Sequence, residues 1–257
     1  MNEGMEIAGK DAQVTGRKLR LVGHKGADLI APGNTVESFR AAVEAGVDTI
    51  EFDVIWLADA HLPVERRHPL VIAHDWEDAG SRTPLALTEA LDAFLEPPLD
   101  QVEIDLDIKL PGREEEFVEA LRERGLIERA MISTMEMHTL KRVLELEPNL
   151  RRGWTYPKTS RDWTKRPWAK PALKVALRGM RLQLPGLAAD KLPKFGVHAM
   201  WVYHPLVSPK LAGICKRAGV ELIAWTVDDE PRMRRLVEMG VDGLVSNDPR
   251  LYADLDP

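Results

Sequence analysis

The chain has 257 residues, of which 44% are hydrophobic and 30% are charged, with a formal net charge of −6 and a pI near 5.7. This length is typical of a one-domain α/β barrel, so we predict one domain over residues 18–257 after a flexible tail at 1–17. The negative charge gives no general attraction to phosphate polymers, so nucleic acid is not an expected partner.

Two further absences narrow the class of protein. Residues 1–17 lack the apolar core of a secretory signal, and no run approaches the length of a membrane span, which predicts a soluble cytoplasmic protein. Cys215 stands alone, so an intrachain disulfide and a cysteine-rich metal cluster are excluded. It lies in a helical apolar pattern and is interpreted as a small core residue.

Short β-type runs alternate with segments of helical periodicity along the chain. This alternation is typical of a parallel sheet with crossover helices. The predicted strands are 19–23, 48–54, 102–109, 130–133, 150–155, 197–203, 220–226 and 243–246, and the predicted helices are 35–45, 87–94, 113–124, 137–146, 208–218 and 231–239. Asn34, three residues before Glu37, is the predicted N-cap of the first helix. The order predicts a single (β/α)8 barrel of the TIM type.

Two connections depart from this regular order. The apolar run 70–73 follows the second strand too closely for a crossover helix, so it is predicted to return as a hairpin against 54–57. The connection 156–196 is long and partly helical, as expected of a lid, an extra helix or a partner surface. Its part 163–181 carries Trp163, Trp168 and many cations, which are compatible with peripheral contact with an anionic membrane. The alternative is a solvated helix that packs Leu173, Val175 and Leu177 on the barrel.

Acidic residues alternate along two of the predicted strands. Glu103, Asp105, Asp107 and Lys109 share one face of their strand, and Glu51 and Asp53 share one face of another. Burying several carboxylates together is costly unless a cation neutralises them. Oxygen ligands of this kind favour Mg²⁺ or Ca²⁺ over a structural zinc ion. The alternative is that these acids pair with Lys or Arg across the strands.

Two histidines follow predicted strands directly. His24 comes after the first strand, and His74 comes after the run 70–73. Catalytic groups of barrel enzymes lie at the carboxyl ends of strands, and imidazole donates and accepts protons near neutral pH. The pair is therefore a candidate acid and base, although a single histidine in such a place is more often structural.

At these positions the chain resembles the glycerophosphodiester phosphodiesterase family. The similar motifs are His24-Lys-Gly, Pro32-Gly-Asn-Thr35, Glu51-Phe-Asp53-Val, His74-Asp75, Asp107-Ile-Lys109, Trp225-Thr-Val-Asp228 and the run Gly-Val-Asp-Gly-Leu-Val-Ser-Asn-Asp-Pro that begins at Gly240. They occur in the family's order across residues 20–250, which makes the set far more specific than any single motif.

The resemblance implies both a reaction and a set of residues. The reaction is hydrolysis of a glycerophosphodiester to sn-glycerol 3-phosphate and an alcohol, with the substrate's glycerol hydroxyl as a candidate first nucleophile. By resemblance, Glu51, Asp53 and the acid before Ile108 hold the metal, and His24 and His74 act as general acid and base. Lys25 and Lys109 would add positive charge beside the phosphate, and Trp225 would line the substrate pocket.

Four features depart from the family pattern. Lys25 replaces an arginine, which exchanges a bidentate fork for a point charge. Gly33 replaces a glutamate, which removes an acidic group from the site. Asp107 replaces a longer glutamate and leaves Glu103 and Asp105 as competing ligands. The span from Asp75 to Glu103 is short, so a segment that covers the substrate is expected to be missing.

Three other functions use the same residues. A wider mouth would allow lysophospholipase D-like activity on lysophospholipids. A catalytically silent barrel would bind phosphodiesters without cleaving them, in line with the changes at Gly33 and Lys25. An enzyme of enolate chemistry would use Lys109 as its base and would not need His74.

Overall fold

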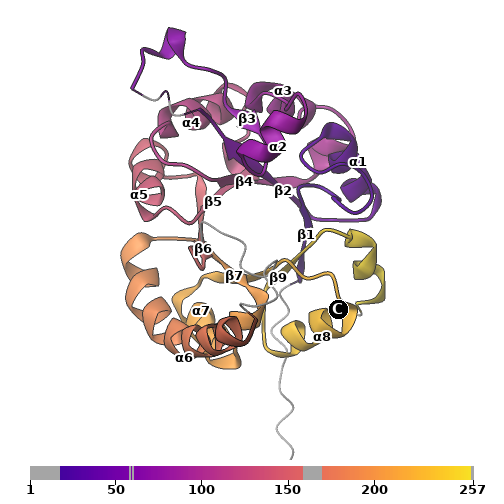
Figure 1. The fold of residues 1–257 in the computed structure, drawn as a ribbon, viewed down its shortest axis with the longest axis vertical. Coiled ribbons are helices and arrows are strands. Elements are labelled where there is room, and N and C mark those ends of the chain that lie inside the picture. Colours follow the sequence, from indigo (N-terminus) through magenta and orange to yellow (C-terminus); the bar gives the residue numbers. More distant parts are fainter. Residues whose placement is uncertain (1–17, 58, 60, 159–169, 256–257) are drawn as a thin grey trace, which may run out of the picture.

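Eight parallel strands close into a barrel in the computed structural model, which describes residues 18–57, 59, 61–158 and 170–255. The strands are β1 (Arg20–His24), β2 (Thr49–Ile55), β4 (Glu103–Ile108), β5 (Ala130–Thr134), β6 (Arg151–Tyr156), β7 (Ala199–Tyr203), β8 (Glu221–Trp225) and β9 (Gly243–Ser246). β1 pairs with both β2 and β9, and this closes the ring that Figure 1 shows down its axis. The predicted TIM barrel is confirmed.

Helices surround the barrel and cover the outer faces of its strands (Figure 1). All six predicted helices are present, as α1 (Val36–Glu44), α3 (Leu87–Ala93), α4 (Glu114–Glu123), α5 (Met137–Leu146), α7 (Pro209–Ala218) and α8 (Glu230–Glu238). The short helix α2 (Trp76–Ser81) was not predicted. Among the described residues, short 3-10 helices lie at Val64–Arg66, Leu99–Gln101, Ile127–Arg129, His204–Leu206 and Pro249–Asp254.

The start of α1 differs from the prediction by one residue. Thr35, not Asn34, is the N-cap, and the Thr35 side chain accepts a hydrogen bond from the backbone N–H of Ser38. Asn34 has a positive φ of 58°, which an N-cap residue does not adopt. The Asn34 side chain is therefore available for a different task, at the site described below.

The predicted hairpin after the second strand is also present. β3 (Val71–Ile72) runs antiparallel to the end of β2, with Val54 opposite Ile72. The connection between β2 and β3 is held by Arg113, a buried residue just before α4. The Arg113 guanidinium donates to the backbone oxygen of His68 at 2.8 Å and contacts Asp59 at 3.4 Å. These contacts attach the connection to the outside of the barrel.

Two apolar cores stabilise the barrel. The larger core lies between the strands and the helices. It includes the stacked rings of Phe52 and Phe94, the tilted ring of Phe39 beside them, and Cys215, which is fully buried as predicted. Burial raises the pKa of the Cys215 thiol to about 12, so it stays an inert thiol. A smaller cluster fills the barrel interior with Val22, Met131, Ala199, Trp201, Ile223 and Val245. The interior is thus packed below the level of the polar site.

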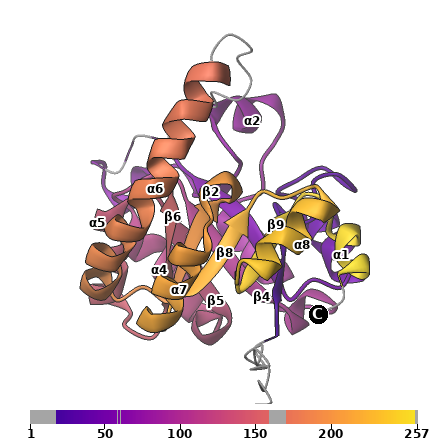
Figure 2. The same cartoon turned by 90° about the horizontal axis from the view of Figure 1, so that it is seen from below.

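The connection between β6 and β7 contains one long helix, α6 (Lys170–Phe195), as its predicted partly helical character suggested. Its second half packs on the barrel with Leu184, Ala188 and Leu192, which are buried at a spacing of four residues. Its first half rises past the carboxyl ends of the strands, on the same side as α2 (Figure 2). The barrel surface does not reach that far, so Val175 is 74% exposed and the predicted packing of this residue is wrong.

Parts of two predictions lie outside the described residues. These parts are the tail at 1–17 and, in the candidate membrane segment, residues 163–169 with Trp163 and Trp168. Within the part of the chain that the structure describes, no helix combines the length and the apolar character needed to cross a membrane.

Candidate active site

Three carboxylates from two neighbouring strands meet at the carboxyl end of the barrel. Asp53 on β2 lies opposite Asp107 on β4 in the strand register, and Glu51 lies two residues before Asp53 on the same face. One oxygen from each of the three carboxylates lies within 4.8 Å of the others. All three residues are buried, with exposed fractions of 4% for Glu51, 0% for Asp53 and 9% for Asp107. The alternating pattern therefore places its acids as predicted.

The charges of this cluster are only partly balanced by the protein. The Lys109 ammonium contacts Asp53 Oδ1 at 2.5 Å and also contacts Asp107. Burial opposes the charge of Lys109, but Asp107, Asp53 and Glu51 together raise its pKa above the ordinary value. Burial alone would raise the pKa of Asp53, but Lys109, His74 and His24 lower it below its ordinary value.

Glu51 and Asp107 remain in an unfavourable environment. Burial and the charge of Asp53 raise the pKa of Glu51 well above its usual range. Burial also raises the pKa of Asp107, and the Lys109 charge only partly offsets this effect. A cation held between the three carboxylates would relieve both burial and repulsion. Because every ligand atom is a carboxylate oxygen, the residues present fit a hard divalent cation.

The two competing acids of β4 lie elsewhere. Glu103 forms ion pairs with Arg20 and Arg151 near the amino ends of the strands. Asp105 is fully buried and accepts a 2.6 Å hydrogen bond from the Ser133 hydroxyl, and burial raises its pKa well above the ordinary value. Neither acid belongs to the carboxylate group around Asp107.

His24 is the last residue of β1, and Asn247 orients its ring. Nδ1 of His24 lies 2.6 Å from Asn247 Oδ1, and Asn247 Nδ2 donates to Asp228 Oδ2 at 2.6 Å. Because a carboxylate only accepts, the amide nitrogen of Asn247 must face Asp228 and its oxygen must face His24. Nδ1 of His24 therefore carries the proton, and Nε2, which lies 4.0 Å from Glu51 Oε2, keeps its lone pair. Burial is the main cause that lowers the pKa of His24 and keeps the ring neutral.

His74 occupies a more open position after β3. Its side chain is 54% exposed, and Nδ1 lies 2.9 Å from Asp75 Oδ2. Asp75 is also the N-cap of α2, where its other oxygen accepts from the backbone N–H groups of Glu77 and Asp78. Hydrogen bonds from Asp78 and from His74 lower the pKa of Asp75, so this carboxylate stays charged beside the imidazole. His24 and His74 both act on the charge of Asp53, so the site brings them together.

The loop between β1 and α1 fixes the edge of the site. Asn34 Nδ2 donates to Asp53 Oδ2 at 2.9 Å, and the backbone N–H of Asp53 donates to Asn34 Oδ1 at 3.1 Å. The fully buried amide of Asn34 therefore orients the central carboxylate of the cluster. Sequence reasoning missed this role, since asparagine before a helix is an ordinary cap signal.

Lys25 and Gly33, the two residues of this loop that differ from the family pattern, both contact Asp28. The Asp28 carboxylate accepts from the backbone N–H of Gly33 at 3.0 Å and pairs with the Lys25 ammonium at 2.5 Å. A Cβ atom at position 33 would lie 2.3 Å from Asp28 Oδ1. Asp28 therefore places a carboxylate beside the point where the side chain of residue 33 would begin. This carboxylate pairs with Lys25 and is not one of the three that meet around Asp53.

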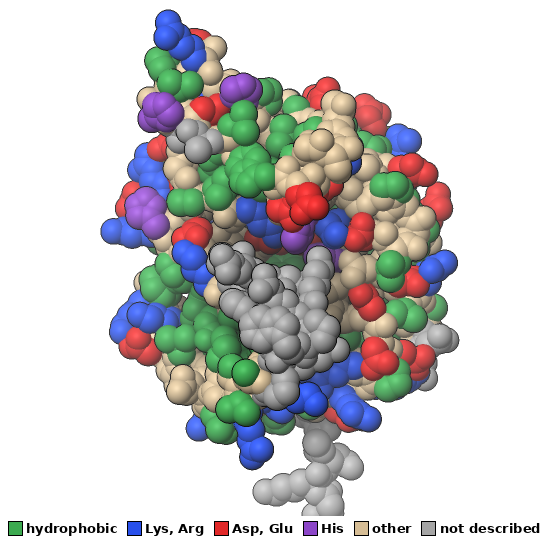
Figure 3. All heavy atoms as spheres, viewed as in Figure 1, with side chains coloured by type: hydrophobic (Ala, Val, Ile, Leu, Met, Phe, Trp, Pro, Cys, Tyr) green, Lys and Arg blue, Asp and Glu red, His purple; other side chains and the backbone are tan. Residues whose placement is uncertain are grey.

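Trp225 lies at the carboxyl end of β8 beside Tyr203, with ring centroids 5.5 Å apart. It packs against the small interior core, and among the described residues its indole N–H has no hydrogen-bond partner. In the space-filling view down the barrel axis, basic, acidic and histidine side chains gather at the mouth (Figure 3). The site therefore combines buried carboxylates, two imidazoles and several donors at the carboxyl end of the barrel.

Comparisons with known proteins identify a matching family and related sequences. The model of the glycerophosphoryl diester phosphodiesterase family matches residues 24–75 and 88–251. A glycerophosphodiester phosphodiesterase of Caldanaerobacter subterraneus subsp. tengcongensis is 27% identical, over 93% of this chain and 98% of that protein.

Solved structures share the fold. One is a glycerophosphodiester phosphodiesterase of Parabacteroides distasonis, with a TM-score of 0.68, 18% identity and coverage of 92% of this chain and 98% of that chain. Another is an Oleispira antarctica phosphodiesterase in complex with the product sn-glycerol-3-phosphate, with a TM-score of 0.64, 19% identity and coverage of 90% and 94%.

Proposed function

Since this chain belongs to the glycerophosphoryl diester phosphodiesterase family and is thereby a phosphoric diester hydrolase, we propose that it is a metal-dependent enzyme that cleaves glycerophosphodiesters to sn-glycerol 3-phosphate and an alcohol. The observation that carries this proposal is the meeting of Glu51, Asp53 and Asp107 within 4.8 Å of one another. These three residues would hold Mg²⁺ or Ca²⁺. When bound, the ion supplies charge neutralisation to the phosphoryl oxygens.

His24 is the proposed general base. Its protonated Nδ1 is fixed by Asn247, so its unprotonated Nε2 can take the proton of the attacking oxygen, either the glycerol hydroxyl of the substrate or water. The new P–O bond then forms at the phosphorus atom.

His74 is the proposed general acid. Its exposed ring lies at the mouth, where a departing alcohol can leave, and the contact of Nδ1 with Asp75 Oδ2 at 2.9 Å orients the ring. As the bond between phosphorus and the alcohol oxygen breaks, His74 donates its proton to that oxygen. The neutral alcohol then departs. Where water was the nucleophile, this step leaves sn-glycerol 3-phosphate. Where the glycerol hydroxyl was the nucleophile, it leaves a cyclic phosphate, and water then attacks the phosphorus and breaks the ring P–O bond to give sn-glycerol 3-phosphate.

Lys25, Lys109 and Trp225 are the proposed substrate-binding residues. An ammonium has three donors, so both lysines retain at least one beyond their carboxylate contacts for a phosphoryl oxygen. The buried indole N–H of Trp225 has no hydrogen-bond partner among the described residues and is a further candidate donor. Because carboxylates hold Lys109 in its charged form, it is poorly suited to act as the base of an enolate mechanism.

Lysophospholipase D-like activity is the second candidate, and it rests on exposed apolar side chains near the mouth. Leu29 of the β1–α1 loop, Leu57 after β2 and Trp76 of α2 are 61%, 43% and 46% exposed, and Val175 of the rising half of α6 is 74% exposed. Such a rim would favour the acyl chain of a lysophospholipid or contact with a membrane surface through residues 163–181.

A hydrolysis panel tests these proposals together. Protein loaded with Mg²⁺ or Ca²⁺ is offered glycerophosphodiesters and lysophospholipids, and the release of glycerol phosphate or free alcohol is measured. We expect His24→Ala and His74→Ala each to lower turnover at least a hundred-fold, and His138→Ala, an exposed histidine on α5, to leave it unchanged. Binding without turnover in the unaltered protein would instead support the silent barrel.

A further inference from the structure

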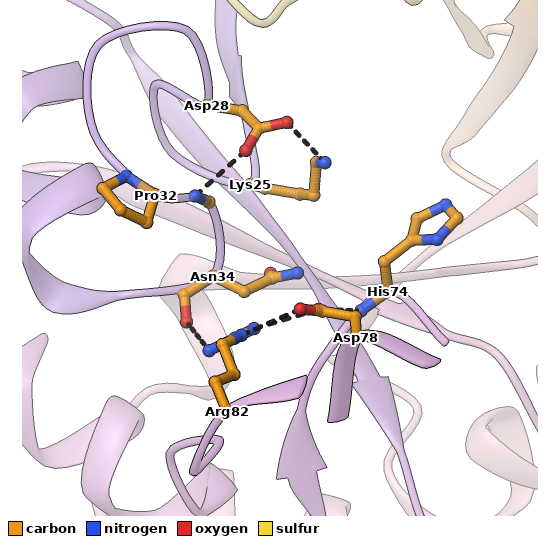
Figure 4. A pocket seen from close by; sticks show the side chains of 8 residues that line it. Lys25, Asp28, Pro32, Asn34, His74, Asp78 and Arg82 are labelled. Carbon is orange, nitrogen blue, oxygen red and sulfur yellow. Dashed lines mark hydrogen bonds and ion pairs between the residues drawn. The ribbon is translucent and has the colours of Figure 1, made fainter. Parts of the chain in front are cut away.

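A cavity of about 380 Å³ opens beside the proposed general acid. One wall is the loop between β1 and α1, and the other is α2 with the residue that follows it (Figure 4). The lining residues are Lys25, Asp28, Pro32, Gly33, Asn34, His74, Asp78 and Arg82. Since His74 is the group that would protonate the departing oxygen, this cavity is the place next to it for the leaving alcohol.

Two ion pairs form opposite walls of the cavity. Lys25 pairs with Asp28 on the loop, and Arg82 donates to both oxygens of Asp78, at 2.8 and 3.0 Å. Further donation from Arg82 to the backbone oxygens of Ile72 and Asn34, at 3.3 and 3.4 Å, fixes its orientation. The four charged side chains remain between 18% and 30% exposed, so a bound molecule can reach them.

The charges of this lining select one class of alcohol. Each carboxylate already has a cation, so the cavity offers no net charge to a quaternary ammonium, and none of its lining residues is the Trp, Tyr or Phe that binds such a cation through its ring face. The paired carboxylates keep further acceptor sites, and the Lys25 and Arg82 groups keep donors. Neighbouring acceptors and donors of this kind match the hydroxyls of a polyhydroxylated alcohol, which both donate and accept.

The cavity also depends on features outside the family pattern. A Cβ at position 33 would lie 2.3 Å from Asp28 Oδ1 and 3.0 Å from Lys25 Cβ, so the wall keeps this shape only with glycine. Asp78 and Arg82 lie in the stretch between residues 75 and 88, which the family model does not match. The residues that shape this cavity are therefore features of this chain and not part of the pattern that the family shares.

We propose that this cavity binds the leaving alcohol of the substrate and selects a neutral polyol, such as glycerol or a cyclitol, over choline. The inference rests on the proposed function, since it names the substrate class of the same site. Gly33, Asp28 and Arg82 are its specificity-determining residues.

The experiment compares three diesters of sn-glycerol 3-phosphate, with inositol, choline and methanol as leaving alcohols. We expect kcat/KM for the inositol diester to exceed that for the methyl diester at least ten-fold, mainly through KM, and the choline diester to show no such gain. In Arg82→Gln and Gly33→Ala, the ratio of the inositol to the methyl value should fall at least five-fold. Arg142→Gln, on the exposed face of α5, is the matched control and should leave the ratio unchanged.

Several outcomes would overturn the inference, and they differ from a failure of the proposed function. Equal kcat/KM values for the three diesters, a ten-fold preference for choline, or an unchanged ratio in both folded variants would each reject the polyol cavity while leaving the hydrolase intact. If no diester is cleaved, the proposed function fails. In that case, saturation-transfer NMR with free inositol and free choline tests the cavity directly. The inference stands only if the protein transfers saturation to inositol and not to choline, and if Arg82→Gln and Gly33→Ala both abolish this transfer.

Discussion

The substitution Asn247→Ala tests whether catalysis needs the His24 ring to be held in one orientation, because the ring stays in place but loses its hydrogen-bond partner. The alanine removes the oxygen that accepts from Nδ1 at 2.6 Å, and it also removes the amide that links the ring to Asp228. The ring then loses the contact that defines its tautomer, so Nε2 is no longer held as the proton acceptor. Asn247 is thus a positioning residue, and its loss should act through His24.

The expected magnitude follows from one hydrogen bond to a part-buried ring. Losing such a bond costs about 1–3 kcal/mol, and each 1.36 kcal/mol is a factor of ten in rate, so kcat/KM should fall about ten- to a hundred-fold. The effect should fall mainly on kcat, because the base acts in the transition state. The Asn247 hydrogen bond raises the pKa of His24, so its removal should lower that pKa further and move the acidic limb of the rate profile to lower pH.

The assay is the pH profile of kcat and KM for a glycerophosphodiester between pH 5 and 9. Asn149→Ala, at an exposed asparagine before β6, is the matched control and should coincide with the unaltered protein. If Asn247→Ala retains kcat/KM within two-fold and its acidic limb does not move, the assignment of His24 as an oriented base is wrong.

Three further predictions test the metal cluster, a buried histidine and a buried tyrosine. Asp107→Asn removes one charge from the group of three carboxylates. Measured by calorimetry, this should weaken the binding of Mg²⁺ or Ca²⁺ about a hundred-fold, or about 2.7 kcal/mol. The control Asp92→Asn, at an exposed residue of α3, should leave the affinity unchanged. Burial and then Arg232 lower the pKa of His204 to about 4, so its stabilising effect is complete above pH 6.5 and is lost as the pH falls towards 4. Between pH 7.5 and 5.5 the unaltered protein should therefore lose about 1 kcal/mol more than His204→Gln in urea unfolding, after allowance for partial exposure, and equal losses would contradict this. Tyr252→Phe leaves the backbone oxygens of Val22 and Leu244 without their 2.8 Å donor, so it should lower stability by about 1–3 kcal/mol, and an unchanged Tm would refute that reading.

The barrel could be predicted because local and global patterns agree along the chain. Strand runs such as 48–54 alternate with helical segments such as 113–124, and a parallel barrel is the common solution for that order. The ligand set could be predicted only in part. Alternation places Glu103, Asp105 and Asp107 on one face, and only the depth along β4 separates the ion-paired, the buried and the clustered carboxylate.

Two neutral amide side chains and the contacts of Asp28 could not be predicted from the sequence. Asn34 and Asn247 carry no charge pattern, and their roles depend on the carboxylate or imidazole that the fold brings opposite them. Asn247 does follow the last strand directly, and that position was the available signal. The changes at Lys25 and Gly33 were read as independent losses, whereas Asp28 connects them across the loop.

Charge balance explains why the cluster suits a divalent ion better than the protein's own cation. Glu51, Asp53 and Asp107 carry three negative charges when ionised, and Lys109 is the ammonium in contact with the two aspartates. Burial and then the neighbouring negative charge of Asp53, which one lysine only partly offsets, raise the pKa values of Glu51 and Asp107. A divalent cation adds the two missing charges, and then all three carboxylates can remain ionised in a buried place. The same balance leaves Lys25, His74 and the indole of Trp225 to meet the negative charge of an arriving phosphodiester.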